Sequence, residues 1–163
     1  MTFKLSTRQN LLKLSLTNSP VKLSGDRMDV RVRETNLGNA VADALLDYGQ
    51  SDFTHKSNLA VTNGGGLRET IAKDKPITKG DIIAVLPFGN SVAQIQVTGQ
   101  NIYDMFVKSL RSILQVDESG KNVFDENGQP LLEPSGGFLQ VAGARYIMTQ
   151  LFQLKNVSYQ LTF

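Results

Sequence analysis

The sequence contains no cysteine, no tryptophan and a single histidine among its 163 residues. The lack of cysteine excludes disulfide bonds, thiol nucleophiles and thiolate metal sites. The single histidine, His55, has no cluster of His, Asp or Glu around it in the sequence, so we expect no zinc or two-metal site in this chain. No G-x-S-x-G motif accompanies it, which leaves no credible Ser-His-Asp arrangement. We therefore expect a recognition module without a catalytic centre, and a solvated loop position for His55.

The sequence also has no large excess of charge of either sign and no long hydrophobic run. The net charge is +2 and no run of Lys and Arg occurs, so we expect no nucleic-acid partner. No apolar run could span a bilayer, and Lys4, Arg8 and Lys13 interrupt every candidate signal-peptide core, so we expect neither membrane insertion nor a signal peptide here. An apolar fraction of 40% and a charged fraction of 20% are typical of a globular chain, and the length fits one domain over 1–163.

Hydrophobic periodicity predicts two main helices, over 36–48 and 101–114. Thr35 or Asn36 can cap the first helix and Gly49 can end it. Thr78 and Asp81 are spaced as a capping pair for a further short helix. Alternation or short apolar runs predict strands over 30–33, 59–61, 94–97, 138–148 and 157–163, while 117–137 is a polar loop or hairpin excursion. The expected fold class is α+β, with a mixed, mostly antiparallel sheet packed against the two helices.

The most informative stretch is Asn63–Arg68, which follows a short apolar run and contains three consecutive glycines. Glycines permit positive φ and leave backbone N–H groups unshielded, so this turn can form a nest for an anion. Arg68 adds a fixed fork of donors that suits phosphate. Without a following Lys-Ser/Thr pair it is no P-loop, and a turn that merely reverses the chain, with a solvated Arg68, is an equal alternative.

Three further residues have two interpretations each. Phe88, between Pro87 and Gly89, offers a stacking face for a base if exposed, whereas burial in the core is the usual fate of phenylalanine. Asn63 can bond a base edge or serve turn chemistry. Arg31 lies on the polar face of the predicted strand over 30–33, where a solvated side chain or a surface ion pair is the default.

Five segments occur together in an order and spacing that resemble the C-terminal domain of 5′-nucleotidases. They are RVRETNLGN (31–39), TNGGGLR (62–68), LPFGN (86–90), TG (98–99) and GFLQV (137–141). The resemblance covers roughly 20–150, and several motifs in register are far more specific than any one of them. The secreted or surface-anchored bacterial members and the animal ecto-5′-nucleotidase are about equally similar in these segments, which implies an extracellular, periplasmic or cell-surface location.

In that family an N-terminal metallophosphoesterase domain holds two divalent metals and performs hydrolysis, while the C-terminal domain binds the nucleoside and swings it to the metals. By motif, Arg31 and Arg68 resemble the arginines that approach phosphate and ribose. Asn63 resembles the contact to the base, and Phe88 resembles one ring of the clamp around it. The implied substrate-binding set is Arg31, Asn63, Gly64, Gly65, Gly66, Arg68, Phe88, Gly89 and Asn90.

Two departures from the family pattern qualify this expectation. The metallophosphoesterase motifs are absent, so we expect no cofactor in this chain and no hydrolysis by it alone. The family's Gly-Gly-Asp-Gly segment, which supplies the second clamp ring and a ribose-binding aspartate, is also absent from 1–163. The expectation is thus the nucleotide-binding domain of a 5′-nucleotidase acting on nucleoside monophosphates or nucleotide sugars. A stand-alone nucleotide-binding module and a purely structural or interaction domain are the alternatives.

Overall fold

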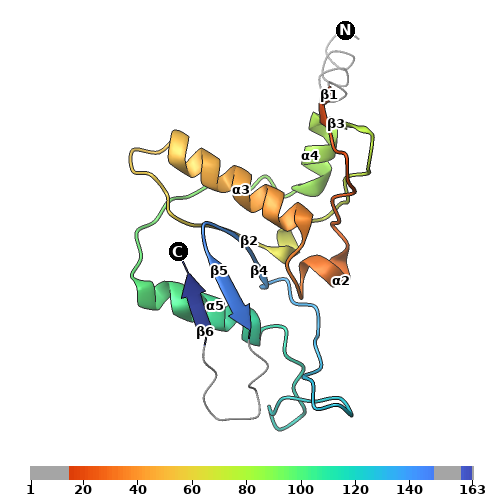
Figure 1. Cartoon of the computed structure of the whole chain (residues 1–163), viewed down its shortest axis with the longest axis vertical. Helices are drawn as coiled ribbons and strands as arrows, with labels where there is room; N and C mark the ends of the chain where they lie inside the picture. The colour runs from red at the N-terminus through yellow and green to blue at the C-terminus, as the bar shows by residue number, and fades with distance from the viewer. Residues whose placement is uncertain (1–14, 149–158, 163) are drawn as a thin grey trace, which may run out of the picture.

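The computed structural model describes residues 15–148 and 159–162. Figure 1 shows the arrangement of its elements, with α3 and α5 on either side of the short strands β2 and β4. In chain order the elements are β1 (Ser15–Asn18), α2 (Arg27–Val30), α3 (Asn36–Ser51), β2 (Ala60–Asn63), the 3-10 turn η1 (Gly64–Gly66), β3 (Pro76–Thr78), α4 (Lys79–Val85), α5 (Gly99–Arg111), β4 (Leu139–Ala142), β5 (Arg145–Met148) and β6 (Tyr159–Thr162).

The strands of the described residues form three antiparallel pairs, β1 with β3, β2 with β4 and β5 with β6. In the central pair, Thr62 faces Gln140 and Asn63 faces Leu139. Helix α3 packs on both β2 and β4. The α+β class and the antiparallel pairing are confirmed. The expected single sheet is instead divided into separate two-stranded pairs.

The predicted helices are present, although their bounds and buried faces differ from expectation. Thr35 caps α3, its hydroxyl accepting from the Gly38 amide at 3.0 Å, and the helix continues two residues past Gly49. The apolar residues whose periodicity predicts this helix, among them Leu37 and Tyr48, are only partly buried. Leu37 is buried, but Tyr48 is 46% exposed, while Gly38, Ala42 and Gly49 face inward. These small residues permit close approach, so α3 contacts its neighbours along a line rotated from its most apolar face.

Two buried clusters stabilise the fold, and the segment that carries Arg31 joins them. The first contains Val30, Leu37, Leu67, Ile71, Ile77 and Val85, from α2 to α4. The second contains Leu110, Ile113 and Phe138, with Val32 packed against it. Val30 and Val32 therefore fix the backbone on both sides of Arg31, because each enters a different cluster.

The strand predicted over 30–33 is wrong. Residues 27–30 form α2, whose N-cap Asp26 accepts a hydrogen bond from the Met28 amide at 2.7 Å. Arg33 forms an ion pair with Asp29 one turn earlier. A helix of one turn is too short for periodicity to identify, so the alternation of valine and arginine suggested a strand.

The strand predicted over 94–97 is also wrong, because the segment between α4 and α5 has no strand partner in the described residues. Ile95 is 78% exposed, and the Gln94 side chain instead donates to the His55 carbonyl at 2.6 Å and to the Ser57 hydroxyl at 2.7 Å. A strand is defined by pairing, which alternation alone does not supply.

The C-terminal part of the chain agrees more closely with the structure predicted from the sequence. Residues 117–137 contain the predicted hairpin excursion, with turns at Gly120 and Gly128, both at positive φ, and bridges that include Val116 with Asn122. It projects from the lower right of Figure 1. The strand predicted over 138–148 is interrupted at Gly143, whose φ of 86° few other residues adopt. Of the strand predicted over 157–163, residues 157, 158 and 163 lie outside the described residues.

The Thr78–Asp81 capping box is present, and we expect it to contribute about 1 kcal/mol to stability. Hydrogen bonds from the Thr78 side chain and backbone lower the pKa of the Asp81 carboxyl below its usual range. Because the folded-state pKa is depressed, the carboxylate stabilises the fold above its ordinary pKa, and this contribution is lost as the pH falls through the folded pKa.

Replacing Thr78 by alanine should therefore raise the Asp81 pKa and lower the free energy of unfolding at neutral pH. Carboxyl NMR titration and urea denaturation measure the two effects. Thr54→Ala, an exposed threonine after α3, is the matched control. An unchanged Asp81 pKa in Thr78→Ala would contradict the capping assignment.

Candidate functional site

The glycine turn after β2 is built for close packing and is not an open anion nest. Gly64, Gly65 and Gly66 form the 3-10 turn η1 and have no positive φ. The Gly64 amide donates to Phe138 O at 2.7 Å and the Gly65 amide to Gly136 O at 3.1 Å. Because these two donors are already used within the protein and none of the three glycines has a positive φ, the structure favours the turn that reverses the chain over the anion nest.

Gly64 brings α2 against the turn. A Cβ at Gly64 would overlap the carbonyl oxygen of Val30 and lie 2.8 Å from its carbonyl carbon. Only glycine permits this approach between backbones. The residue after Val30 is Arg31, so the contact holds that arginine beside the loop that carries Arg68.

Arg68 leaves the turn and lies over the ring of Phe88. Its guanidinium carbon is 5.6 Å from the ring centroid, within cation–π range. Phe88 is 59% exposed, so of its two interpretations the structure favours the exposed ring. A planar cation and an accessible aromatic face are thus placed together at the end of α4.

Arg31 lies near the Arg68–Phe88 pair. The residue is half-buried, and its Nε is inaccessible and has no hydrogen-bond partner in the described structure. Burial lowers the pKa of the Arg31 guanidinium, and repulsion from Arg27 and Arg68 lowers it further. Within residues 15–148 and 159–162, none of these three arginines forms an ion pair with a carboxylate. Three neighbouring cations without a counter-ion favour an anionic ligand.

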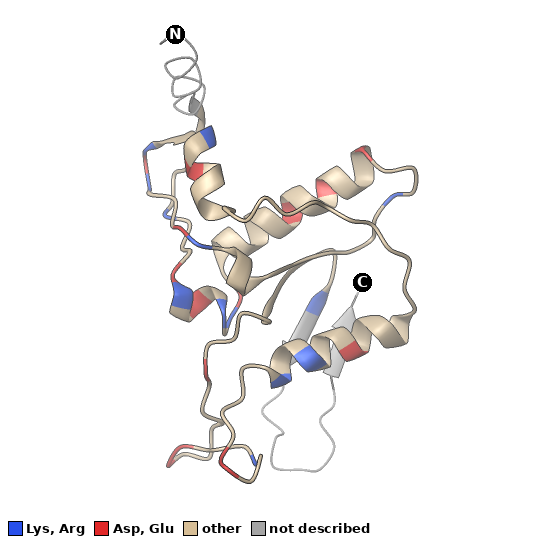
Figure 2. Cartoon of the chain, turned by 180° about the vertical axis from the view of Figure 1, so that it is seen from behind, with Lys and Arg blue, Asp and Glu red and all other residues tan. Residues whose placement is uncertain are grey.

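Arg27 is a candidate that the sequence interpretation missed. It lies four residues before Arg31, a spacing that places two side chains on one face of a helix. The signal was available in the sequence, but the strand predicted over 30–33 did not include Arg27. Figure 2 shows that basic and acidic residues are otherwise interspersed over the ribbon, in keeping with the small net charge.

A cavity of about 1230 Å³ adjoins the Arg68–Phe88 pair. Phe88, Gly89, Asn90, Asn63 and Gly66 line it, together with apolar residues of α3, α5 and the segment between α4 and α5. That segment carries no charged residue and is uniformly tan in Figure 2. The Asn63 side-chain amide donates to Gly136 O at 3.0 Å, which leaves its oxygen as the group able to accept from a ligand. Five predicted residues therefore share one cavity. The other four, Arg31, Gly64, Gly65 and Arg68, lie outside its lining, although Arg68 contacts the lining residue Phe88.

The position of His55 and the spacing of the acidic residues decide whether the described part of the chain could hold a metal ion. His55 is exposed in the loop after α3 and lines the same cavity. Among the described residues, no three His, Cys, Asp or Glu side chains gather closely enough to hold a metal ion. Nor does any helix in that part of the chain combine the length and apolar character needed to cross a bilayer.

The sequence of the chain is similar to those of several nucleotide-hydrolysing proteins. The chain is 36% identical over 129 residues to the trifunctional nucleotide phosphoesterase protein YfkN of Bacillus subtilis, a match that covers 79% of this chain and 7% of that protein. It is 38% identical over 96 residues to a 5′-nucleotidase of Vibrio parahaemolyticus, covering 59% of this chain and 16% of the relative. The human 5′-nucleotidase is 27% identical over 133 residues, with 78% and 20% covered.

The structure superimposes on a crystal structure of a 5′-nucleotidase precursor from Thermus thermophilus with a TM-score of 0.66 at 32% identity. That match covers 88% of this chain but only 24% of the other, so the chain spans a minor part of its relatives. The family model of the 5′-nucleotidase C-terminal domain matches residues 15–152. The chain therefore belongs to the 5′-nucleotidase C-terminal domain family.

Proposed function

We propose that this chain binds a nucleoside monophosphate and presents it to a metallophosphoesterase domain of the same protein, which hydrolyses it to nucleoside and phosphate. The observation that carries the proposal is the Arg68 guanidinium over the exposed Phe88 ring, with the half-buried Arg31 near it. Neither arginine is paired with a carboxylate of the described residues. The site thus joins a phosphate-binding group to a stacking surface, which are the two chemical needs of a nucleotide.

Each residue has a distinct role in this proposal. Arg31 and Arg68, with Arg27 beside them, bind the phosphate and the ribose edge. Phe88 stacks on one face of the base, and the Asn63 side-chain oxygen accepts from a base or ribose donor. In this proposal the chain supplies binding and orientation, and the metallophosphoesterase domain supplies the hydrolysis. From the resemblance to secreted and surface-anchored members of the family, we propose that the complete enzyme acts in an extracellular, periplasmic or cell-surface location.

The proposal predicts a selective effect of Arg68→Gln. The substitution removes the cation and should weaken AMP binding about tenfold, as for loss of one charge-assisted contact, while adenosine binding changes much less. Dissociation constants come from NMR chemical-shift titration of the full chain at fixed ionic strength. Arg111→Gln, an exposed arginine in the last turn of α5, is the charge-matched control. Equal weakening of AMP and adenosine, or native AMP binding no tighter than adenosine binding, would contradict the proposed function.

A further inference from the structure

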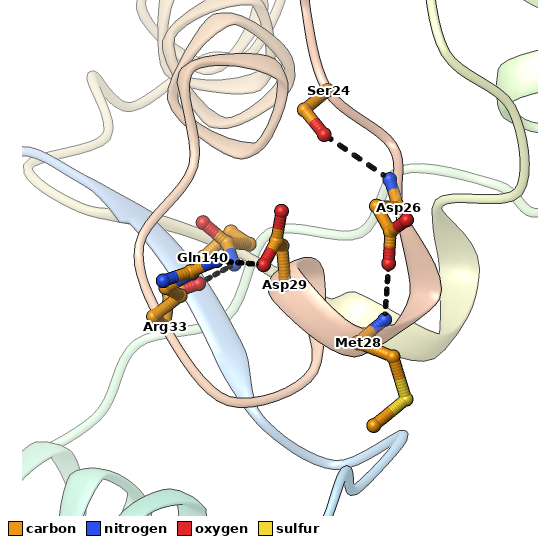
Figure 3. Close-up of polar contacts among 6 residues, drawn as sticks. All are labelled: Ser24, Asp26, Met28, Asp29, Arg33 and Gln140. Carbon is orange, nitrogen blue, oxygen red and sulfur yellow. Dashed lines mark hydrogen bonds and ion pairs between the residues drawn. The ribbon is translucent and has the colours of Figure 1, made fainter.

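Gln140 is a buried polar residue of β4 whose side chain bonds only to backbone. It is 1% exposed. Its amide nitrogen donates to Val30 O at 3.0 Å and to Arg33 O at 2.8 Å, and its oxygen accepts from the Thr35 amide at 3.1 Å. Figure 3 shows Gln140 reaching from the β4 ribbon to Arg33, beside Asp29. Both protons of the amide nitrogen and one lone pair of the oxygen are thereby satisfied.

The three backbone partners of Gln140 lie on both sides of Arg31 in the sequence. Val30 precedes it directly, while Arg33 and Thr35 follow it. On the other side, Gln140 faces Thr62 across the β2–β4 pair, one position before Asn63 and the glycine turn. Gln140 thus connects the backbone around Arg31 to the strand that leads to Arg68.

Gly38 fixes the orientation of the Gln140 amide. A Cβ at Gly38 would overlap the amide oxygen and carbon of Gln140 and lie 2.6 Å from its Cγ. The first turn of α3 therefore closes over the amide and leaves it little freedom. Val30 O receives the Gln140 donor, while Gly64 packs against the same carbonyl.

We propose that Gln140 is a positioning residue for phosphate recognition. It acts through the backbone of residues 30–35 to hold Arg31 beside Arg68, and it does not touch the ligand itself. The inference rests on the proposed function, since it assigns a support to the same arginine site. If Gln140 served stability alone, its replacement would not weaken AMP binding more than adenosine binding.

The test compares Gln140→Met, similar in length but unable to make these hydrogen bonds, with the native full chain. AMP and adenosine dissociation constants are measured by NMR titration, and the midpoint of thermal unfolding by circular dichroism. We expect AMP binding to weaken about tenfold, because the arginine fork loses its preorganisation, while adenosine binding changes less than about twofold. The AMP-to-adenosine ratio is the readout that a purely structural role would not move.

Ser109→Ala is the matched control. Ser109 is 3% exposed, and its hydroxyl accepts from the amide of Leu139, the strand neighbour of Gln140, at 2.9 Å. This substitution also removes a hydrogen bond to β4, a partly buried one on the α5 side. It should lower the unfolding midpoint while leaving the AMP-to-adenosine ratio at its native value.

Gly38→Ala provides a second variant if Gln140→Met folds poorly. It retains the glutamine but displaces its amide, and alanine favours the helix that contains it. It should reproduce the selective loss of AMP affinity. Equal weakening of both ligands, or an unchanged ratio in a folded variant, would overturn the inference. A native chain that does not prefer AMP to adenosine would instead overturn the proposed function on which the inference rests.

Discussion

Gly64→Ala is expected to be the most damaging single-methyl substitution in the candidate site, lowering the free energy of unfolding by about 3 kcal/mol. The added Cβ overlaps the carbonyl oxygen of Val30 and approaches its carbonyl carbon to 2.8 Å. Both groups belong to the backbone, so no rotamer change relieves the overlap. Relief requires α2 to move away from η1, which also moves Arg31 from Arg68 and should reduce AMP affinity.

Urea denaturation of the full chain measures the stability effect, and Gly66→Ala is the control in the same turn. A Cβ at Gly66 would lie 3.4 Å from the Asn63 side-chain oxygen, an ordinary contact with a group that can adjust. We expect Gly66→Ala to cost less than about 1 kcal/mol. An unfolding midpoint of Gly64→Ala that equals that of the control would refute the close approach described here.

Phe88→Ala should have the largest effect on nucleoside affinity with the least effect on stability. Base stacking on an aromatic side chain is worth about 1–3 kcal/mol, so the affinities for AMP and adenosine should both fall by about 5-fold to 150-fold. The ring is 59% exposed, and its loss should change the free energy of unfolding by less than about 0.5 kcal/mol. Loss of both ligands distinguishes this residue from Arg68, whose replacement should act mainly on AMP.

NMR titration with AMP and adenosine checks this result. Phe124→Ala is the aromatic control, because Phe124 is 39% exposed and lies in the 117–137 excursion. Native-like binding of both ligands by Phe88→Ala would show that the base stacks elsewhere. Weakened binding in Phe124→Ala would point to a general effect of removing exposed rings.

The sequence by itself determined the features that depend on short-range chemistry. The caps at Thr35 and Thr78 mark the starts of α3 and α4, since a side-chain oxygen and the backbone amides it serves lie within one turn. Five motifs in register identified the family, which the comparisons confirm over residues 15–152. The residue types of the candidate site, arginines with an asparagine and a phenylalanine, could also be identified from the sequence, although their positions in space could not.

Only the tertiary structure decided which segments approach one another. Alternation over 30–33 and 94–97 predicted strands, but pairing needs a partner that is remote in sequence, and neither segment has one in the described residues. From the sequence, the three glycines could form either an anion nest or a turn that reverses the chain. In the structure, Gly64 is required because Val30 packs against it, a contact between segments more than thirty positions apart. Arg27 and Gln140 gain their significance in the same way, because charge proximity and buried hydrogen bonds depend on distance in space, which periodicity does not encode.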